Sequence, residues 1–143
     1  RHDLRLPPHR GGPGARRQRE CPRPHRERHA DLRVSAHGTA TDRGDVAESH
    51  ATAQVFGNRI PISAFKSYTG HTLGACGSLE AMVAIEMMNR GWFHGTVNLE
   101  NVDPECADLD YLKGAGRQIS TGCVMSNNFA FGGINTSLIF RAL

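Results

Sequence analysis

The sequence lacks the patterns that mark several common classes of protein. Its four cysteines, Cys21, Cys76, Cys106 and Cys123, form no C-x-x-C pair, which argues against zinc-finger and thioredoxin-like sites. No apolar run is long enough to span a bilayer, and no signal peptide is visible. No glycine-rich phosphate loop follows a strand and opens a helix, which disfavours nucleotide binding. These absences lead us to expect a cytoplasmic protein with no membrane association.

Net positive charge is confined to the first thirty residues. Residues 1–30 hold nine of the fifteen arginines and five of the seven prolines, and their net charge is +6, whereas residues 31–143 carry −3. Proline and glycine pairs in this segment break any helix or strand pattern. We interpret residues 1–30 as a disordered or non-native basic arm, similar to an out-of-frame translation of GC-rich DNA. Because the remainder is acidic, we expect no nucleic-acid partner, and an RNA-binding tail is an alternative that rests on this arm alone.

Residues 31–143 read as one α/β domain with the order β-α-β-α-β-β. A capping box is predicted at the start of the first helix, with Asp45 as N-cap and Glu48 at N3. The second helix is expected to bury one face that carries Leu79, Met82, Val83 and Met87. The predicted strands cover residues 32–36, 61–65, 122–129 and 136–140, and the helices cover 45–56 and 79–90.

The most informative stretch runs from Lys66 to Gly77, between a predicted strand and the second helix. It contains Lys66, His71 and three glycines in twelve residues. A second histidine, His37, follows the end of the first predicted strand. If the two strands are neighbours in one sheet, both imidazoles and the lysine emerge at the same edge.

Two neutral histidines that donate N–H bonds to one oxygen would form an oxyanion site. A nearby lysine favours an anionic ligand and disfavours protonation of the histidines. The alternative is that His37 and His71 are ordinary hydrogen-bonded residues at strand ends. No metal site is expected, since no third ligand lies at suitable spacing.

Four segments, in this order along the chain, resemble motifs of the elongating β-ketoacyl-acyl-carrier-protein synthases. The segment from Ser35 to Thr41, followed by Gly44, Asp45 and Glu48, resembles the first histidine motif of that family. Residues 66–75 are similar to its lysine and second-histidine motif. Residues 95–100 and 126–135 resemble its C-terminal motifs. On this resemblance, residues 31–143 are part of the C-terminal half of a thiolase-like fold, with a layered α-β-α arrangement.

The resemblance implies a decarboxylating Claisen condensation, in which malonyl on acyl-carrier protein attacks an acyl thioester during fatty-acid synthesis. It implies that His37 and His71 bind the malonyl thioester oxygen and that Lys66 orders the site, paired with Glu48. Asp45 and Glu48 would support the site. No cofactor is implied, because the phosphopantetheine arm belongs to the acyl-carrier protein, and the intact enzyme is expected to be a homodimer. The residues implied to bind substrate are Thr39, Thr41, Phe129, Phe131 and Gly132.

The sequence also departs from the family pattern. The nucleophilic cysteine of the family lies in its N-terminal half, and none of the four cysteines here sits in that motif. We therefore expect a C-terminal fragment that is inactive alone. The alternatives are a ketosynthase for polyketide or aryl-polyene chains and a non-catalytic subunit that resembles a chain-length factor, although the two histidines argue against the latter.

Overall fold

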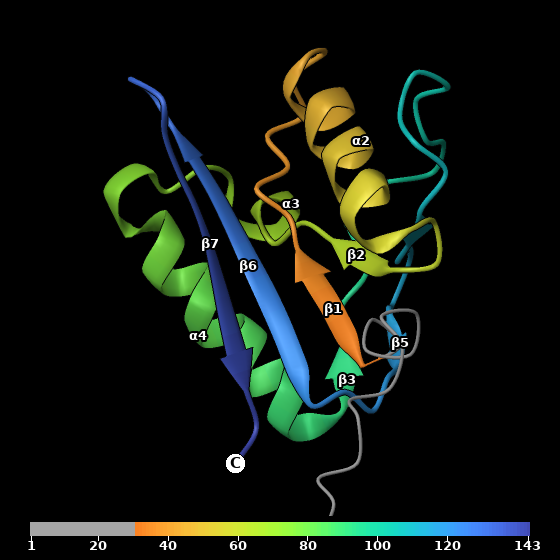
Figure 1. The fold of residues 1–143 in the computed structure, drawn as a ribbon, viewed down its shortest axis with the longest axis vertical. Helices are drawn as coiled ribbons and strands as arrows, with labels where there is room; N and C mark the ends of the chain where they lie inside the picture. The colour runs from red at the N-terminus through yellow and green to blue at the C-terminus, as the bar shows by residue number, and fades with distance from the viewer. Residues whose placement is uncertain (1–30) are drawn as a thin grey trace, which may run out of the picture.

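The computed structural model describes residues 31–143, so the arm expected over residues 1–30 lies outside the described residues. The described part is a mixed α/β structure (Figure 1). Its elements, in chain order, are β1 (Leu32–Ser35), α2 (Gly44–Phe56), β2 (Pro61–Ser63), α3 (Lys66–Thr69), the 3₁₀ turn η1 (Leu73–Ala75), α4 (Cys76–Arg90), β3 (Trp92–Phe93), β4 (Asp110–Tyr111), β5 (Arg117–Gln118), β6 (Cys123–Ala130) and β7 (Ile134–Arg141).

A five-stranded sheet with the order β4-β2-β1-β6-β7 forms the centre of the fold. The pairs β4-β2, β2-β1 and β1-β6 are parallel, and β7 returns antiparallel to β6 through a short hairpin. All four residues of β1 are buried, as expected for a parallel strand that is covered on both faces. Helix α2 lies over one face and α4 over the other, which gives the expected α-β-α layering (Figure 1).

Two apolar clusters join the helices to the two faces of the sheet. On the α2 face, Ala53 and Phe56 pack against a cluster made of Leu32, Val34, Ala36, Ile60, Ile62, Leu109 and Met125. On the α4 face, the helix itself supplies half of a cluster made of Ala84, Met87, Met88, Phe93, Leu112 and Val124. Alternate residues of β1 and β6 therefore serve opposite layers, which fixes the register of the central strands.

A charged side chain lies beside the apolar cluster on the α4 face. Arg33 is fully buried on β1, with its guanidinium 3.9 Å from the centre of the Phe93 ring. One of its nitrogens donates to the hydroxyl of Ser63. Burial, reinforced by the charge of Arg117, lowers the pKa of Arg33 to about 9. The cation–π contact and the hydroxyl partly replace the water that this group has lost.

Helix α4 begins three residues earlier than expected and buries a face that only partly overlaps the expected one. Its buried residues are Cys76, Glu80, Ala84, Met87 and Met88, which follow an i, i+4, i+8, i+11, i+12 pattern. Of the residues expected on the buried face, Met87 is buried and Val83 packs against the α4 cluster, but Met82 is 60% exposed. The buried face includes the acidic residue Glu80. A search for apolar residues alone therefore assigns the buried face partly to a different side of the helix.

The remaining differences concern short elements. The three strands β3, β4 and β5 have two residues each and were not predicted, since two residues show no periodicity. The start of the Lys66–Gly77 stretch forms a helical turn, α3, and not an open loop. The two C-terminal strands are confirmed; β6 is shifted by one residue from its expected bounds, and β7 extends beyond them at both ends.

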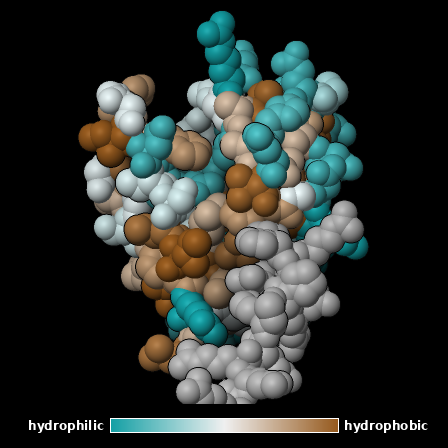
Figure 2. Space-filling view, viewed as in Figure 1, coloured by the Kyte–Doolittle hydropathy of each residue, from teal (hydrophilic) through white to brown (hydrophobic). Residues whose placement is uncertain are grey.

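Strand β7 and the adjoining turn leave apolar side chains uncovered. Ile134, Leu138 and Ile139 are all more than half exposed, and Phe131 in the turn is 98% exposed. Figure 2 shows apolar surface over β6 and β7, beside the part of the sheet that α2 covers. Within residues 31–143, no helix has both the length and the apolar character that crossing a membrane requires.

Two methionines on α4 test the assigned face. Met87→Ala removes a side chain that is 6% exposed, so we expect the free energy of unfolding to fall by about 2–4 kcal/mol. Met82→Ala, on the exposed face of the same helix, is expected to change it by less than about 0.5 kcal/mol. Urea denaturation followed by circular dichroism measures both. Equal losses for the two variants would contradict the assignment.

Candidate active site

The parallel pairing of β1 and β2 brings their carboxyl ends together. Val34 pairs with Ile62 and Ser35 with Ser63. His37 lies two residues after the end of β1, and Lys66 begins the helical turn that follows β2. The sequence-based expectation that these two side chains emerge at one edge of the sheet is confirmed, since their nitrogens lie 3.0 Å apart.

Two carboxylates of α2 hold the backbone of the His37 turn. Glu48 accepts hydrogen bonds from the amide N–H of His37 at 3.0 Å and of Gly38 at 3.1 Å. Asp45 accepts one from the N–H of Thr39 at 3.0 Å. These bonds satisfy three consecutive backbone donors just beyond the end of β1. The turn is therefore fixed by the helix that follows it.

The predicted capping box is wrong for the same reason. Helix α2 begins at Gly44, with Arg43 at the N-cap and no side-chain cap. The Asp45 and Glu48 carboxylates bind the His37 turn, so they do not serve the helix's own first amides. Asp45 and Glu48 have the spacing of a capping box, but their carboxylates make tertiary contacts with the His37 turn.

Gly38 allows the turn to pack closely against β2. Its φ is +30°, in the region that L side chains rarely adopt, and an added Cβ would lie 2.6 Å from the Cβ of Ala64. Glycine is the residue that tolerates both conditions. The His37 turn therefore lies directly against the strand that leads to Lys66.

Lys66 forms a buried ion pair with Glu80, and not with Glu48 as the family resemblance implied. Its Nζ lies 2.6 Å from Oε1 of Glu80, and both side chains are almost fully buried. The same Nζ lies 3.0 Å from Nδ1 of His37. Glu48 is occupied by backbone amides on the other face of the sheet, so α4 supplies the partner for the lysine.

Hydrogen bonds fix the tautomer of both histidines. The Lys66 ammonium has only donors, so Nδ1 of His37 accepts from it. The backbone N–H of Leu73 donates to Nδ1 of His71 at 3.0 Å. In each neutral ring the proton therefore lies on Nε2. The rings meet edge to face, with their centroids 5.3 Å apart. The site thus carries two Nε2–H donors on neighbouring rings.

The environment keeps His37 uncharged. Burial, reinforced by the charges of Lys66 and His71, lowers its pKa to about 4. A histidine with this pKa is neutral near pH 7 and donates through one nitrogen only. Two neutral donors around one point can stabilise a developing oxyanion without a change of protonation.

A second buried carboxylate stands behind the turn. Burial raises the pKa of Glu48, and its hydrogen bonds with Gly38, Asn127 and His37 oppose that shift. Asn127 on β6 donates its side-chain N–H to Oε1 of Glu48 at 3.0 Å, and Ser137 on β7 donates to the amide oxygen of Asn127. The carboxylate therefore connects β1, α2 and the C-terminal hairpin.

The two histidines line an open cavity of about 770 Å³. Thr39 and Thr41 lie on its wall, and their hydroxyls are 3.1 Å apart. Phe129 lies edge to face with His37 at 5.5 Å, and Phe131 projects from the β6–β7 turn. The structure therefore brings four of the five residues predicted to bind substrate to this cavity.

Gly132, the fifth of these residues, lies in the β6–β7 turn beside Phe131 and not on the cavity wall. Its φ of +86° gives it a role in shaping the hairpin turn. Its predicted role in substrate binding stays a prediction.

The cysteines do not join the histidine pair. Cys76 is buried at the start of α4 and lines the cavity, while Cys106 and Cys123 lie elsewhere. Cys21 falls outside the described residues. Over residues 31–143, no group of three His, Cys, Asp or Glu side chains is arranged to hold a metal ion.

Sequence reasoning missed Glu80 and Asn127. Glu80 follows Cys76 by four residues and precedes Ala84 by four, so helical spacing could have placed it on the buried face. Asn127 stands in a strand motif that was recognised, but its partner lies 79 residues away in sequence. No local pattern indicates such a contact.

Comparison with known proteins places this geometry in a family. The model for the C-terminal domain of β-ketoacyl synthases matches residues 29–100, about half of the chain. The chain belongs to the β-ketoacyl synthase family. It is 43% identical over 111 residues to 3-oxoacyl-[acyl-carrier-protein] synthase 2 of Synechocystis sp., covering 76% of this chain and 26% of the relative. It is 42% identical over 112 residues to synthase 1 of Escherichia coli K12, covering 77% and 27%.

Solved structures of ketosynthases share the fold. A β-ketoacyl synthase from Burkholderia phymatum STM815 is 67% identical, with a TM-score of 0.78, over 80% of this chain and 28% of that one. The ishigamide ketosynthase/chain length factor is 33% identical, with a TM-score of 0.74, over 79% and 28%. The same identity, TM-score and coverage are found for a type II polyketide synthase acyl-carrier protein in complex with its ketosynthase. The expected thiolase-like ketosynthase fold is confirmed, and the chain spans about a quarter of its relatives' length.

The charge of Lys66 is expected to contribute to the low pKa of His37. In Lys66→Met the ammonium is removed and Glu80 is left nearby, so the pKa of His37 should rise from about 4 towards 6.5. Titration of the imidazole signals by NMR measures this shift. Lys113→Met, at an exposed position away from the histidines, is the control and should leave the pKa unchanged. An unshifted His37 in Lys66→Met would contradict the assigned contact.

The same pKa predicts how stability depends on pH. As pH falls from 6.5 to 4, His37 takes up a proton in the unfolded chain before it does so in the fold. The free energy of unfolding should therefore decrease over this window, and His37→Gln should remove that part of the slope. Glu48, whose pKa is raised, acts in the opposite sense. Urea denaturation at several pH values compares wild type with His37→Gln, and identical slopes would refute the prediction.

Proposed function

We propose that this chain provides the malonyl-binding part of the active site of a β-ketoacyl-[acyl-carrier-protein] synthase. The observation that carries the proposal is the pair of Nε2–H donors on His37 and His71, held beside each other at the edge of the cavity. Both donate to the thioester oxygen of a malonyl group. When the carbon–carboxylate bond breaks, carbon dioxide leaves, and the electron pair moves into the thioester to form an enolate that the two donors stabilise.

The other residues of the site have supporting roles in this proposal. Lys66 and Glu80 keep the Nδ1 side of His37 occupied, so Nε2 carries the proton. Thr39 and Thr41 bind the phosphopantetheine arm, and Phe129 and Phe131 border its path. The chain's own residues require no cofactor for these steps, since the arm comes with the acyl-carrier protein.

The second half of the reaction needs residues that this chain does not match. The enolate carbon attacks an acyl thioester carried on a cysteine, the new carbon–carbon bond forms and the cysteine thiolate leaves. In the family that cysteine belongs to the N-terminal half, and this chain spans about a quarter of its relatives. We therefore propose that residues 31–143 are inactive alone and act together with the remainder of a synthase, as a homodimer with acyl-carrier protein as partner.

Fatty-acid elongation is the pathway that similarity favours. The relatives named as 3-oxoacyl-[acyl-carrier-protein] synthases are 42–43% identical to this chain, against 33% for the ishigamide and type II polyketide ketosynthases. Polyketide elongation remains the second candidate, because those structures share the fold at a TM-score of 0.74. The catalytic residues proposed here would serve either pathway.

A chimeric enzyme tests the proposal. Residues 31–143 replace the matching region of the Burkholderia phymatum synthase, to which the chain is 67% identical. We expect this chimera to condense malonyl- and acyl-carrier protein and residues 31–143 alone to give no product. His37→Ala or His71→Ala should each lower the rate of malonyl decarboxylation by about 10²–10³, the usual cost of losing one oxyanion donor.

His50→Ala supplies the matched control, because His50 is an exposed histidine of α2 whose ring bonds to the backbone of Glu105. This variant should keep the rate of the unsubstituted chimera. An inactive unsubstituted chimera would count against the proposal. So would His37→Ala and His71→Ala variants that decarboxylate as fast as His50→Ala.

A further inference from the structure

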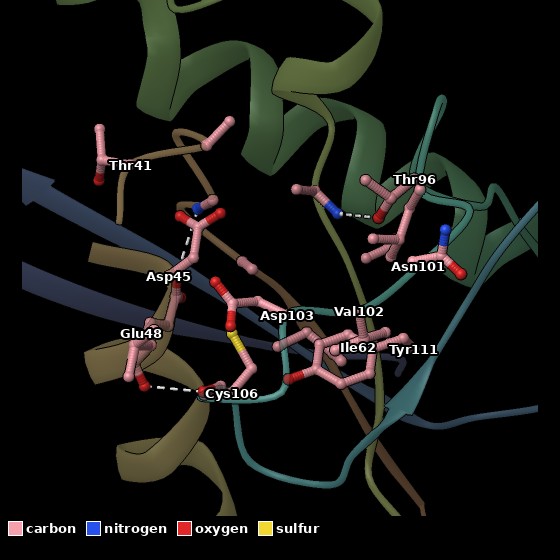
Figure 3. Close-up of a pocket in the computed structure, with 18 of the residues that line it drawn as sticks. Thr41, Asp45, Glu48, Ile62, Thr96, Asn101, Val102, Asp103, Cys106 and Tyr111 are labelled. Carbon is pink, nitrogen blue, oxygen red and sulfur yellow. Dashed lines mark hydrogen bonds between the residues drawn. The ribbon is translucent and has the colours of Figure 1, made fainter. Parts of the chain in front are cut away.

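A second cavity lies behind the His37 turn, on the opposite side from the histidine rings. Its volume is about 290 Å³, and it opens between α2 and the segment 96–106 (Figure 3). The ends of β1 and β2 form its floor, through Ala36 and Ile62. Neither His37 nor His71 lines it, but it adjoins the cavity assigned to the malonyl group and shares Gly38, Thr41, Asp45 and Glu48 with it.

The body of this cavity is apolar. Leu99, Val102, Tyr111 and Ile62 line it, and Figure 3 shows Ile62, Val102 and Tyr111 gathered on one side. Its volume is at the lower end of the range for small-molecule sites, about 300–1,000 Å³. Such a space admits only a compact apolar group.

The polar part of the lining carries charge of one sign. Four carboxylates line the cavity, and none of its lining residues within the described part of the chain is Lys, Arg or His. In Figure 3, Asp45 lies away from the apolar group, and Asp103 lies between that group and Asp45. Each accepts one backbone N–H, from Thr39 and Glu105, and retains further acceptor capacity. This arrangement favours a cationic ligand and repels an anionic one.

Hydrogen bonds tie the end of the segment 96–106 and the residue that follows it to α2. The N–H of Ala107 donates to the hydroxyl of Ser49 at 3.0 Å, and Nε2 of His50 lies 2.9 Å from the carbonyl oxygen of Glu105. A carbonyl only accepts, so the imidazole donates. The wall that holds Asp103 is thus tied to α2 and does not depend on an occupant for its position.

The cavity also touches the residues that hold the catalytic turn. Gly38, Asp45 and Glu48 all line it, and the two carboxylates bind the amides of residues 37–39. We propose that this cavity is a second ligand site, for a compact amine with an aliphatic or aromatic body, and that its occupant acts on the His37 turn through Asp45 and Glu48. The site adjoins the proposed malonyl site without including either histidine, and its binding test does not depend on condensing activity.

Matched probes test the chemistry of the site. Hexylamine and hexanoate have bodies of similar length and opposite charge, and each is titrated into the full chain while backbone amide NMR signals are followed. We expect saturable shifts with hexylamine that include the amides of Gly38 and Val102. Hexanoate at the same concentrations should give no saturable shift at those amides. Absence of hexylamine binding, or equal binding of both probes, overturns the proposal.

Two variants locate the binding. Val102→Phe fills the cavity and should abolish the hexylamine shifts, whereas Val55→Phe, at a position of α2 that is 63% exposed, should leave them unchanged. Asp103→Asn keeps the hydrogen-bond acceptor and removes one charge, so it should weaken hexylamine binding by about two- to fivefold. If Val102→Phe does not fold, Asp103→Asn decides alone. Unchanged affinity in Asp103→Asn, or in a folded Val102→Phe, overturns the proposal.

Discussion

The buried ion pair between Lys66 and Glu80 is the interaction on which the candidate site depends. It places an ammonium group next to Nδ1 of His37 and thereby fixes which nitrogen of that ring carries the proton. Two charges taken out of water gain stability only when each finds its partner with good geometry. Glu80 comes from α4, so the apolar packing of that helix against β6 also sets the electrostatics of the site. Helix α4 therefore supplies both part of the apolar core and the ionic partner of Lys66.

A second carboxylate has a mechanical role on the other face of the sheet. Glu48 takes no part in the ion pair and holds the backbone of the turn that carries His37. The two acids act on the same histidine in different ways, one on its ring through Lys66 and the other on its backbone. The sheet edge lies between them, and His37 therefore projects from a turn that is fixed from both layers.

Sequence reasoning recovered the long elements and the histidine pair, because strong periodicity and motif order carry that information. It failed where a tertiary contact overrode a local pattern. Asp45 and Glu48 have capping-box spacing, yet they bind a turn outside their helix. Glu80 is acidic, and so it was not among the residues expected on the buried face of α4, although an ion pair allows it to be buried. Arg33 is likewise buried, in contact with Phe93, and nothing local indicates that.

The bond from Asn127 to Glu48 has a consequence for the order of folding. It joins residues 79 positions apart, and β1 completes its pairing only with β6, whose residues 123–126 stand opposite 32–35. Such non-local parallel contacts form late, because the closure of a long loop precedes any gain from them. During synthesis the two histidines leave the ribosome well before β6, the strand whose Asn127 binds the Glu48 carboxylate that holds the His37 turn. The site is therefore assembled only after nearly the whole of residues 31–143 has been made.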